Sequence, residues 1–166
     1  MNSKGQNLTS LFIDTVDQNR TAMFRLAYSI VQNREDAEDV VSESILKAYS
    51  HLAELKNTKK MKAWLFQIIA NESRTCLRKR KQVELTEDFS LFSANETKEK
   101  SSYDLLESVY QLSENFREVI LLYYFEEFRI KEIASILAIS EGTVKSRLSR
   151  ARETLKRALE QDDQKG

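Results

Sequence analysis

Proline is absent from these 166 residues, and glycine occurs only three times. β-Hairpins and β-sandwiches need turn residues that accept unusual backbone angles, and these two residue types supply many of them. Their scarcity predicts an all-α chain. The sequence also lacks an apolar run near the ~20 residues of a membrane span, and it does not start with a basic segment followed by an apolar one. We therefore expect a cytoplasmic protein.

Cysteine and histidine, which bind zinc and act as nucleophiles or catalytic bases, are scarce. Cys76 is the only cysteine and His51 the only histidine. An intrachain disulfide, a thiolate cluster, a zinc site or a histidine-based nucleophile system therefore has almost nothing to draw on. We expect no cofactor and no metal, and we interpret both residues as ordinary helix or loop positions.

The formal net charge is zero, but the charges are unevenly distributed. Residues 74–81 hold five basic side chains and no acidic one, and residues 141–157 hold six basic side chains against two acidic ones. Residues 84–107, between them, hold seven acidic side chains against two basic ones. Two basic segments separated by an acidic one favour a protein that binds nucleic acid through two surfaces.

The spacing of apolar residues predicts four helices in the first half, over about 8–16, 23–31, 37–52 and 61–81. Residues 56–60, before the last of them, lack this periodicity and are polar, which predicts a loop. Asn33, between the second and third helices, can either close one or begin the other.

Residues 82–103 are acidic and rich in serine and threonine, with only scattered apolar positions. This composition predicts a linker that is flexible in the free protein. Helical periodicity then resumes, with Ser113 and Ser140 as candidate N-caps. The final helix is predicted to bury a stripe formed by Val144, Leu148, Ala151, Leu155 and Leu159. We therefore divide the chain into a domain at 1–81, a linker at 82–103 and a domain at 104–166.

Residues 130–152 have the layout of a helix-turn-helix. Ala134 is small where two helices would cross, and Ile133 and Leu137 would face the core. The second helix then exposes Glu141, Lys145, Ser146, Ser149, Arg150 and Arg152. Short polar groups mixed with lysine and arginine can read base edges in a major groove and bind phosphates. A helical hairpin with a solvated basic face is the alternative interpretation.

The segment from 133 to 148, IASILAISEGTVKSRL, followed by Arg150-Ala151-Arg152, closely resembles the C-terminal promoter-binding domain of extracytoplasmic-function sigma factors. The resemblance implies that this helix reads the −35 promoter element. It assigns −35 DNA binding to Glu141, Thr143, Lys145, Ser146, Arg147, Ser149, Arg150 and Arg152, with Lys145, Ser146 and Ser149 as base readers. Ala138 departs from the glycine common in such turns, at a cost of ~1 kcal/mol if its backbone is left-handed. Ser113 stands where the family often has proline.

Residues 36–49, DAEDVVSESILKAY, resemble the polymerase-binding helix of the same family. The resemblance assigns contacts with core RNA polymerase to Asp36, Glu38, Asp39, Val40, Glu43, Ser44 and Lys47. Physically, the five acidic side chains between Glu35 and Glu43 repel one another unless solvent or a basic partner meets them. An acidic, merely solvated helix face is the alternative.

Residues 64–71, WLFQIIAN, followed by LRKRK at 77–81, resemble the family's −10-reading helix. The loop at 55–60 corresponds to the one that captures an extruded base. The resemblance assigns −10 DNA binding to Asn57, Thr58, Lys59 and Lys60 in the loop and to Arg74, Arg78, Lys79 and Arg80 on the helix. The spacing of Trp64 favours a core position over a stacking platform. Thr75 stands where the family commonly has aspartate.

The resemblance thus implies two small all-α domains, one sigma-2-like and one helix-turn-helix sigma-4-like, in an RNA polymerase sigma factor that is not an enzyme. The implied partners are the β′ and β subunits of core RNA polymerase, promoter DNA and an anti-sigma factor, which in this family is often membrane-anchored. No small-molecule substrate is expected. The rival hypotheses are a dimeric helix-turn-helix regulator and, with least support, an enzyme that binds a metal through the acids at 36–43.

Overall fold

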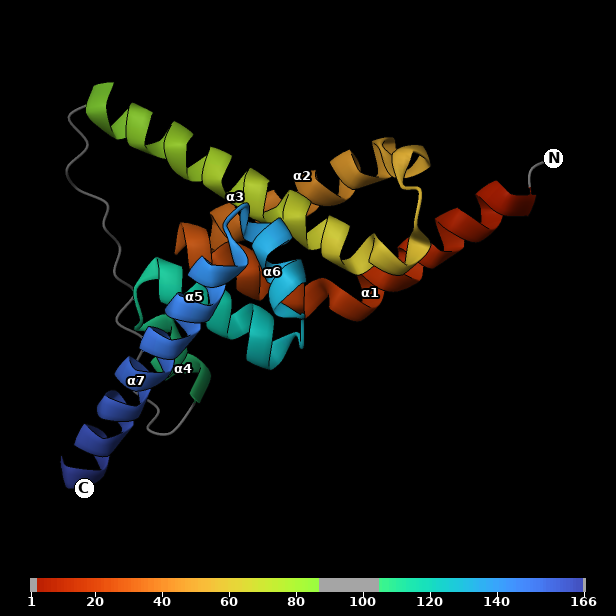
Figure 1. The fold of residues 1–166 in the computed structure, drawn as a ribbon. Coiled ribbons are helices and arrows are strands. Elements are labelled where there is room, and N and C mark those ends of the chain that lie inside the picture. The colour runs from red at the N-terminus through yellow and green to blue at the C-terminus, as the bar shows by residue number, and fades with distance from the viewer. Residues whose placement is uncertain (1–2, 87–104, 166) are drawn as a thin grey trace.

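The structure, a computed structural model, describes residues 3–86 and 105–165 (Figure 1). All regular elements in these two ranges are helical, which confirms the predicted fold class. The first half contains α1 (Ser3–Val31), α2 (Arg34–Ser50), the short turns η1 (Leu52–Glu54) and η2 (Thr58–Lys60), and α3 (Met61–Thr86). The second half contains α4 (Leu105–Tyr110), α5 (Glu114–Ile120), η3 (Leu121–Phe125), α6 (Ile130–Leu137) and α7 (Glu141–Lys165).

The prediction of two helices before residue 32 was wrong, because α1 is one continuous helix. The polar residues between Val16 and Met23 interrupt the apolar pattern but not the backbone. They include neither glycine nor proline, and Arg20 pairs with Asp17 one turn earlier at 3.3 Å. A gap in apolar spacing therefore marked an exposed stretch of one helix rather than its end.

A two-residue turn separates α1 from α2. Gln32 has a left-handed backbone with φ of 52°, and its N–H donates to the carbonyl of Tyr28 at 2.9 Å. Asn33 follows in an extended conformation, and its Oδ1 accepts from the N–H of Asp36 at 3.0 Å. Asn33 is thus the N-cap of α2, which resolves the two roles that the sequence left open.

The helices α1, α2 and α3 pack against one another around one apolar core. Its largest fully buried side chains are Met23, Leu26, Met61, Leu65, Phe66 and Ile69. Trp64 is partly buried against this core, as its spacing predicted.

In the second half, α5 continues into a π-helical turn, in which the N–H of Glu126 donates to the carbonyl of Leu121 at 3.1 Å. Ser113 occupies the N-cap position of α5, but its side chain makes no capping hydrogen bond, contrary to its predicted role. The core of this half includes Leu121, Leu122, Ile133, Ile136 and Leu148.

The two halves lie in contact, with α6 packed against α3 and α5 against α1 (Figure 1). The N-terminal turns of α1 and the C-terminal turns of α7 extend away at opposite ends of the molecule (Figure 1). The helix α3 continues to Thr86, past the predicted start of the linker, and the rest of the predicted linker up to 103 lies outside the described residues. Within the described ranges, none of the helices combines the length and the apolar character that a membrane span requires.

Candidate nucleic-acid and protein interfaces

The turn between α6 and α7 has the geometry of a helix-turn-helix. Ala138 is left-handed, with φ of 55° and ψ of 45°, and the next N–H, that of Ile139, donates to the carbonyl of Ala134 at 3.0 Å. Ser140 then caps α7, because its Oγ accepts from the N–H of Thr143 at 3.1 Å. The serine cap predicted from the sequence is confirmed, and Ala138 has the left-handed backbone on which its expected cost of ~1 kcal/mol depended.

The buried residues of this unit fix which side of α7 faces solvent. Val144 and Leu148 are buried against α6 and α5. The opposite side exposes the side chains of Lys145, Ser146, Ser149 and Arg150, while Thr143 and Arg147 are half-buried and Glu141 is exposed in the first turn. This is the face that the sequence assigned to the −35 element, and the role of each residue stays a prediction. Arg152 is also exposed, but it lies on the side of Leu148, with its guanidinium 5.9 Å from the centroid of the Tyr124 ring.

Two arginines on the basic end of α3 are held by acids from other helices. Nη2 of Arg74 donates to Oε2 of Glu118, on α5, at 3.2 Å. Nη1 of Arg80 donates to Oδ2 of Asp36, on α2, at 3.1 Å. Arg78 and Lys79 are exposed. The predicted −10 residues on this helix therefore include two that also make tertiary contacts.

Thr75, where the family commonly has an acid, takes part in a local hydrogen-bond chain. Its Oγ1 donates to the carbonyl of Asn71 at 3.0 Å and accepts from Nη2 of Arg78 at 3.3 Å. The hydroxyl can thus orient Arg78 without adding a negative charge. Beside it lies a hollow of about 470 Å³, lined by Asn71, Arg74, Thr75, Leu77, Arg78, Lys81 and Glu114.

The sequence predicted a loop at residues 56–60, but part of this segment has regular structure. Residues 58–60 form the 3-10 turn η2, and the Oδ1 of Asn57 caps it by accepting from the N–H of Lys59 at 3.1 Å. Asn57, Thr58, Lys59 and Lys60 are all exposed. The four predicted loop residues are therefore accessible, and Asn57 has a structural role as well.

The acidic face of α2 is also accessible, with Glu38, Asp39 and Glu43 exposed. Val40 and Ser44 belong to the same predicted set but lie in the core, so their side chains are not part of this face. Within the described residues, the Oγ of Ser44 has no hydrogen-bond partner. Lys47 is the last residue of the predicted set along α2, and its Nζ donates to Oε1 of Glu72 on α3 at 2.7 Å.

Two apolar side chains on this face were missed. Leu46 is 70% exposed and Tyr49 is 57% exposed. They stand three and six residues after Glu43, on neighbouring turns of the helix. Their exposure could have been predicted from the sequence, because helical spacing puts both residues on the same side of the helix as the exposed acids.

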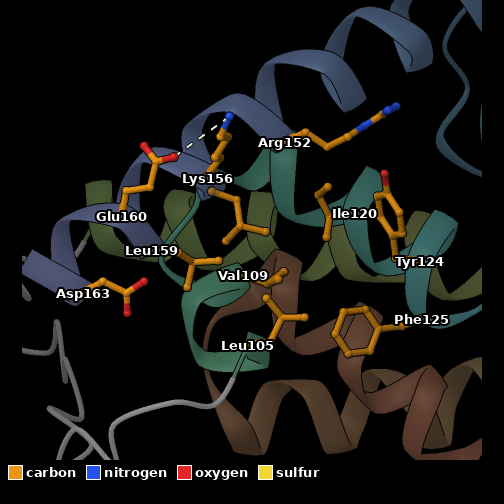
Figure 2. Close-up of a pocket in the computed structure, with 11 residues that line it drawn as sticks. Leu105, Val109, Ile120, Tyr124, Phe125, Arg152, Lys156, Leu159, Glu160 and Asp163 are labelled. Atoms are coloured by element: carbon orange, nitrogen blue, oxygen red, sulfur yellow. Dashed lines mark ion pairs between the residues drawn. The ribbon is translucent and has the colours of Figure 1, made fainter.

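A second missed feature is an apolar groove of about 400 Å³ between α4, the α5–η3 segment and α7 (Figure 2). Leu105, Val109, Ile120, Phe125 and Leu159 point toward one another there, and Arg152, Lys156, Glu160 and Asp163 stand on its α7 side (Figure 2). Leu159 was expected to be buried but is 40% exposed, because its stretch of α7 forms one wall of this open groove. No cluster of metal-ligating side chains occurs within the described residues.

Each half of the chain matches a known protein family model. The model described as sigma-70 region 2 matches residues 15–83, and the one described as sigma-70, region 4 matches residues 103–155. The chain is 32% identical to RNA polymerase sigma factor SigV of Bacillus subtilis, over 96% of this chain and 98% of that protein. It is 30% identical to ECF RNA polymerase sigma factor SigW of the same organism, over 89% and 88% of the two chains.

Two solved structures are similar across both halves. One is sigma factor RpoE in complex with the anti-sigma factor NepR from Bartonella quintana, with 27% identity and a TM-score of 0.74 over 96% of this chain and 98% of that one. The other is CnrH in complex with the cytosolic domain of CnrY, with 25% identity and a TM-score of 0.63 over 91% and 88%.

An acidic helix face, a basic helix and a helix-turn-helix, in this order, define a transcription initiation factor that meets DNA through two units. The chain belongs to the extracytoplasmic-function RNA polymerase sigma factors of the sigma-70 family.

Proposed function

We propose that the first half of this sigma factor docks on core RNA polymerase and engages the melted −10 element, while α7 reads the duplex −35 element. The observation that carries the proposal is the face of α7. Lys145 and Ser146 are exposed there on a helix whose opposite side is buried and whose N-terminus is capped by Ser140. A rigid helix with free polar side chains is what base reading in a major groove requires.

For core polymerase, we propose the exposed acids of α2 as the contact, with Leu46 among them as an apolar anchor. Charges around a central apolar side chain favour fast encounter with a basic partner and then desolvated packing. For the −10 element, we propose that the loop residues Asn57 and Thr58 read sequence, while Arg78 and Lys79 bind phosphates. Phosphate contacts position the strand but carry no sequence information.

We further propose that the chain acts in the cytoplasm without catalysis of its own, and that its functional units correspond to 1–81 and 104–166 with a linker between. An anti-sigma factor is the proposed regulator. The support is that RpoE, which matches both halves, is described in complex with the anti-sigma factor NepR.

The test is in-vitro transcription with purified core polymerase on a promoter library randomised at both elements, with start sites mapped by sequencing. The proposal expects initiation only when this chain is added, at promoters that share one −35 and one −10 sequence. Addition without promoter-specific initiation, or specific DNA binding as a stable dimer without core polymerase, would contradict it.

A further inference from the structure

The hollow beside Thr75 is formed mainly by one side of α3, and we call it the basic hollow. Its volume is about 470 Å³, within the ~300–1,000 Å³ of common small-ligand sites. Its lining residues are Asn71, Arg74, Thr75, Leu77, Arg78 and Lys81 on α3 and Glu114 on α5. Four of the α3 residues follow Asn71 by three, four, seven and ten positions, so helical spacing puts them on one side of the helix.

Positive charge dominates the basic hollow. Three of its residues are cations, against the single acid Glu114. Arg74 is held by Glu118 at 3.2 Å. Arg78 and Lys81, by contrast, are exposed and form no ion pair with an acid among the described residues. Two cations without acidic partners on one hollowed surface attract an anion.

The guanidinium of Arg78 has donors available, unlike that of Arg117 on α5. Arg117 donates from Nε and Nη2 to the carbonyl of Ser29 on α1, at 3.0 and 2.7 Å, and from Nη1 to the carbonyl of Leu112 at 2.6 Å. Arg78 makes one hydrogen bond within the described residues, from Nη2 to Oγ1 of Thr75 at 3.3 Å. Most of its five N–H groups can therefore meet a ligand.

Thr75 holds Arg78 in place without cancelling its charge. The hydroxyl donates its hydrogen to the carbonyl of Asn71 at 3.0 Å, so its lone pairs remain to accept from Arg78. A methyl group at this place could accept no hydrogen bond, and a carboxylate would neutralise the guanidinium. A neutral acceptor therefore suits an arginine that must offer its full charge to a ligand.

We propose that the basic hollow binds a phosphate of the melted −10 strand, with Arg78 and Lys81 as its contacts and Thr75 as the residue that positions Arg78. This inference rests on the proposed function and adds Lys81 and Thr75, which none of the predicted sites includes. Arginine binds a phosphate through paired N–H donors, whereas lysine acts as a point charge. Leu77 adds an apolar wall, which suits the carbon atoms of the adjoining sugar.

The test uses the complex of the full chain with core polymerase. Its affinity for a labelled single strand, which carries the −10 sequence selected from the promoter library, is measured by fluorescence anisotropy over a range of salt concentrations. Lys81→Ala should weaken binding about fivefold at low salt. It should also lower the slope of log affinity against log salt by about 0.7, the value for one phosphate contact on a single strand.

Thr75 is tested through its partner. Thr75→Val keeps the shape of the side chain and should weaken binding about threefold, which corresponds to one ordinary hydrogen bond. Thr75→Ser should restore wild-type affinity, and Thr75→Asp should weaken binding more than Thr75→Val. In the background of Arg78→Ala, Thr75→Val should have no further effect, because its role passes through that guanidinium. A loss of packing alone would persist in that background.

Two matched substitutions outside the basic hollow serve as controls. Thr15 on α1 is also half-buried, and its Oγ1 donates to the carbonyl four residues earlier at 2.7 Å, as that of Thr75 does. Lys4 is an exposed lysine near the start of α1. Thr15→Val and Lys4→Ala should leave the affinity for the strand and the salt slope at their wild-type values.

A small phosphorylated molecule would present the same chemistry as a strand phosphate. Inorganic pyrophosphate is therefore titrated into the free chain by calorimetry. A Kd above ~1 mM supports a phosphate that is held as part of a longer strand, where many contacts act together. A Kd below ~1 mM that Lys81→Ala abolishes would identify a small phosphate as the ligand and overturn the assignment to DNA.

The inference is also overturned if Lys81→Ala and Thr75→Val both bind the strand with wild-type affinity and salt slope. Promoter-specific initiation by the wild-type chain is measured in parallel. Its absence contradicts the proposed function and, with it, this inference. Its presence together with unchanged strand binding by both variants contradicts only the role of the basic hollow.

Discussion

On α7, the exposed side chains of Lys145 and Ser146 make no hydrogen bond or ion pair to the rest of the described chain. On α3, by contrast, Arg74 and Arg80 each hold an acid from another helix. Substitutions on α7 can therefore be interpreted as effects on DNA, whereas substitutions on α3 also change how the protein is held together. A substitution of a predicted DNA-binding residue on α3 therefore needs a control for protein stability, whereas one at Lys145 or Ser146 does not.

The largest effect is expected on α2, where the predicted partner is a protein. Asp39→Lys with Glu43→Lys should lower the affinity for core polymerase at least ~100-fold, because two attractive charges become repulsive. Both side chains are exposed, so stability should change by less than ~0.5 kcal/mol. Co-purification with core and thermal denaturation are the measurements. Glu153→Lys with Asp162→Lys makes the same change of charge on α7, and an equal loss there would refute a localised contact.

The next effect concerns the pH dependence of stability and comes from Glu118, which pairs with Arg74 on α3. Since the pKa of Glu118 is about 7 in the folded chain and near its ordinary 4.5 when unfolded, folding takes up a proton between these values. The contribution of this carboxyl is therefore full below pH ~4.5 and falls as the pH rises to about 7, by on the order of 3 kcal/mol. Denaturant unfolding from pH 5 to 8 measures this, and Glu118→Gln should flatten the slope. A wild-type stability that rises over this range and parallels that of the variant would contradict it.

On α7, Lys145→Ala or Ser146→Ala should alter the preference among −35 sequences by ~1–3 kcal/mol without affecting stability. Arg150→Ala should instead weaken all promoters alike and lower the salt slope by roughly one unit. Competitive transcription on −35 variants separates the two outcomes. If Lys145 and Ser146 variants rank the promoters as wild type does, base reading lies elsewhere.

The smallest effect is expected in the loop before α3. Asn57→Ala removes the cap of η2 and should cost ~1 kcal/mol of stability. With Thr58→Ala, it should also change −10 preference while core binding persists. Lys56→Ala, one residue earlier and equally exposed, is the control. An unchanged −10 preference in the double variant would restrict Asn57 to its capping role.

Local signals made much of this structure predictable. The cap at Ser140 depends on a neighbour three residues away and was predicted from the sequence. For Asn33 and Ala138, the sequence indicated a special position but left open which helix Asn33 caps and whether Ala138 is left-handed. The continuity of α1 was missed because apolar spacing reports which side of a helix is buried, not where the helix ends.

The pairing of Arg74 with Glu118 and of Lys47 with Glu72 could not have been predicted. Each joins residues on different helices, and sequence spacing does not determine which helices meet.

The contact between Arg117 and Ser29 also has a consequence during synthesis. Its partners are 88 residues apart, so at ~5–20 residues per second Arg117 is added to the growing chain roughly 4 to 18 seconds after Ser29. During that interval, the carbonyl that later accepts two N–H donors from the guanidinium must be hydrated. The first half is therefore synthesised with a hydrated carbonyl at a position that the complete chain buries, and the contact can form only after α5 has been added.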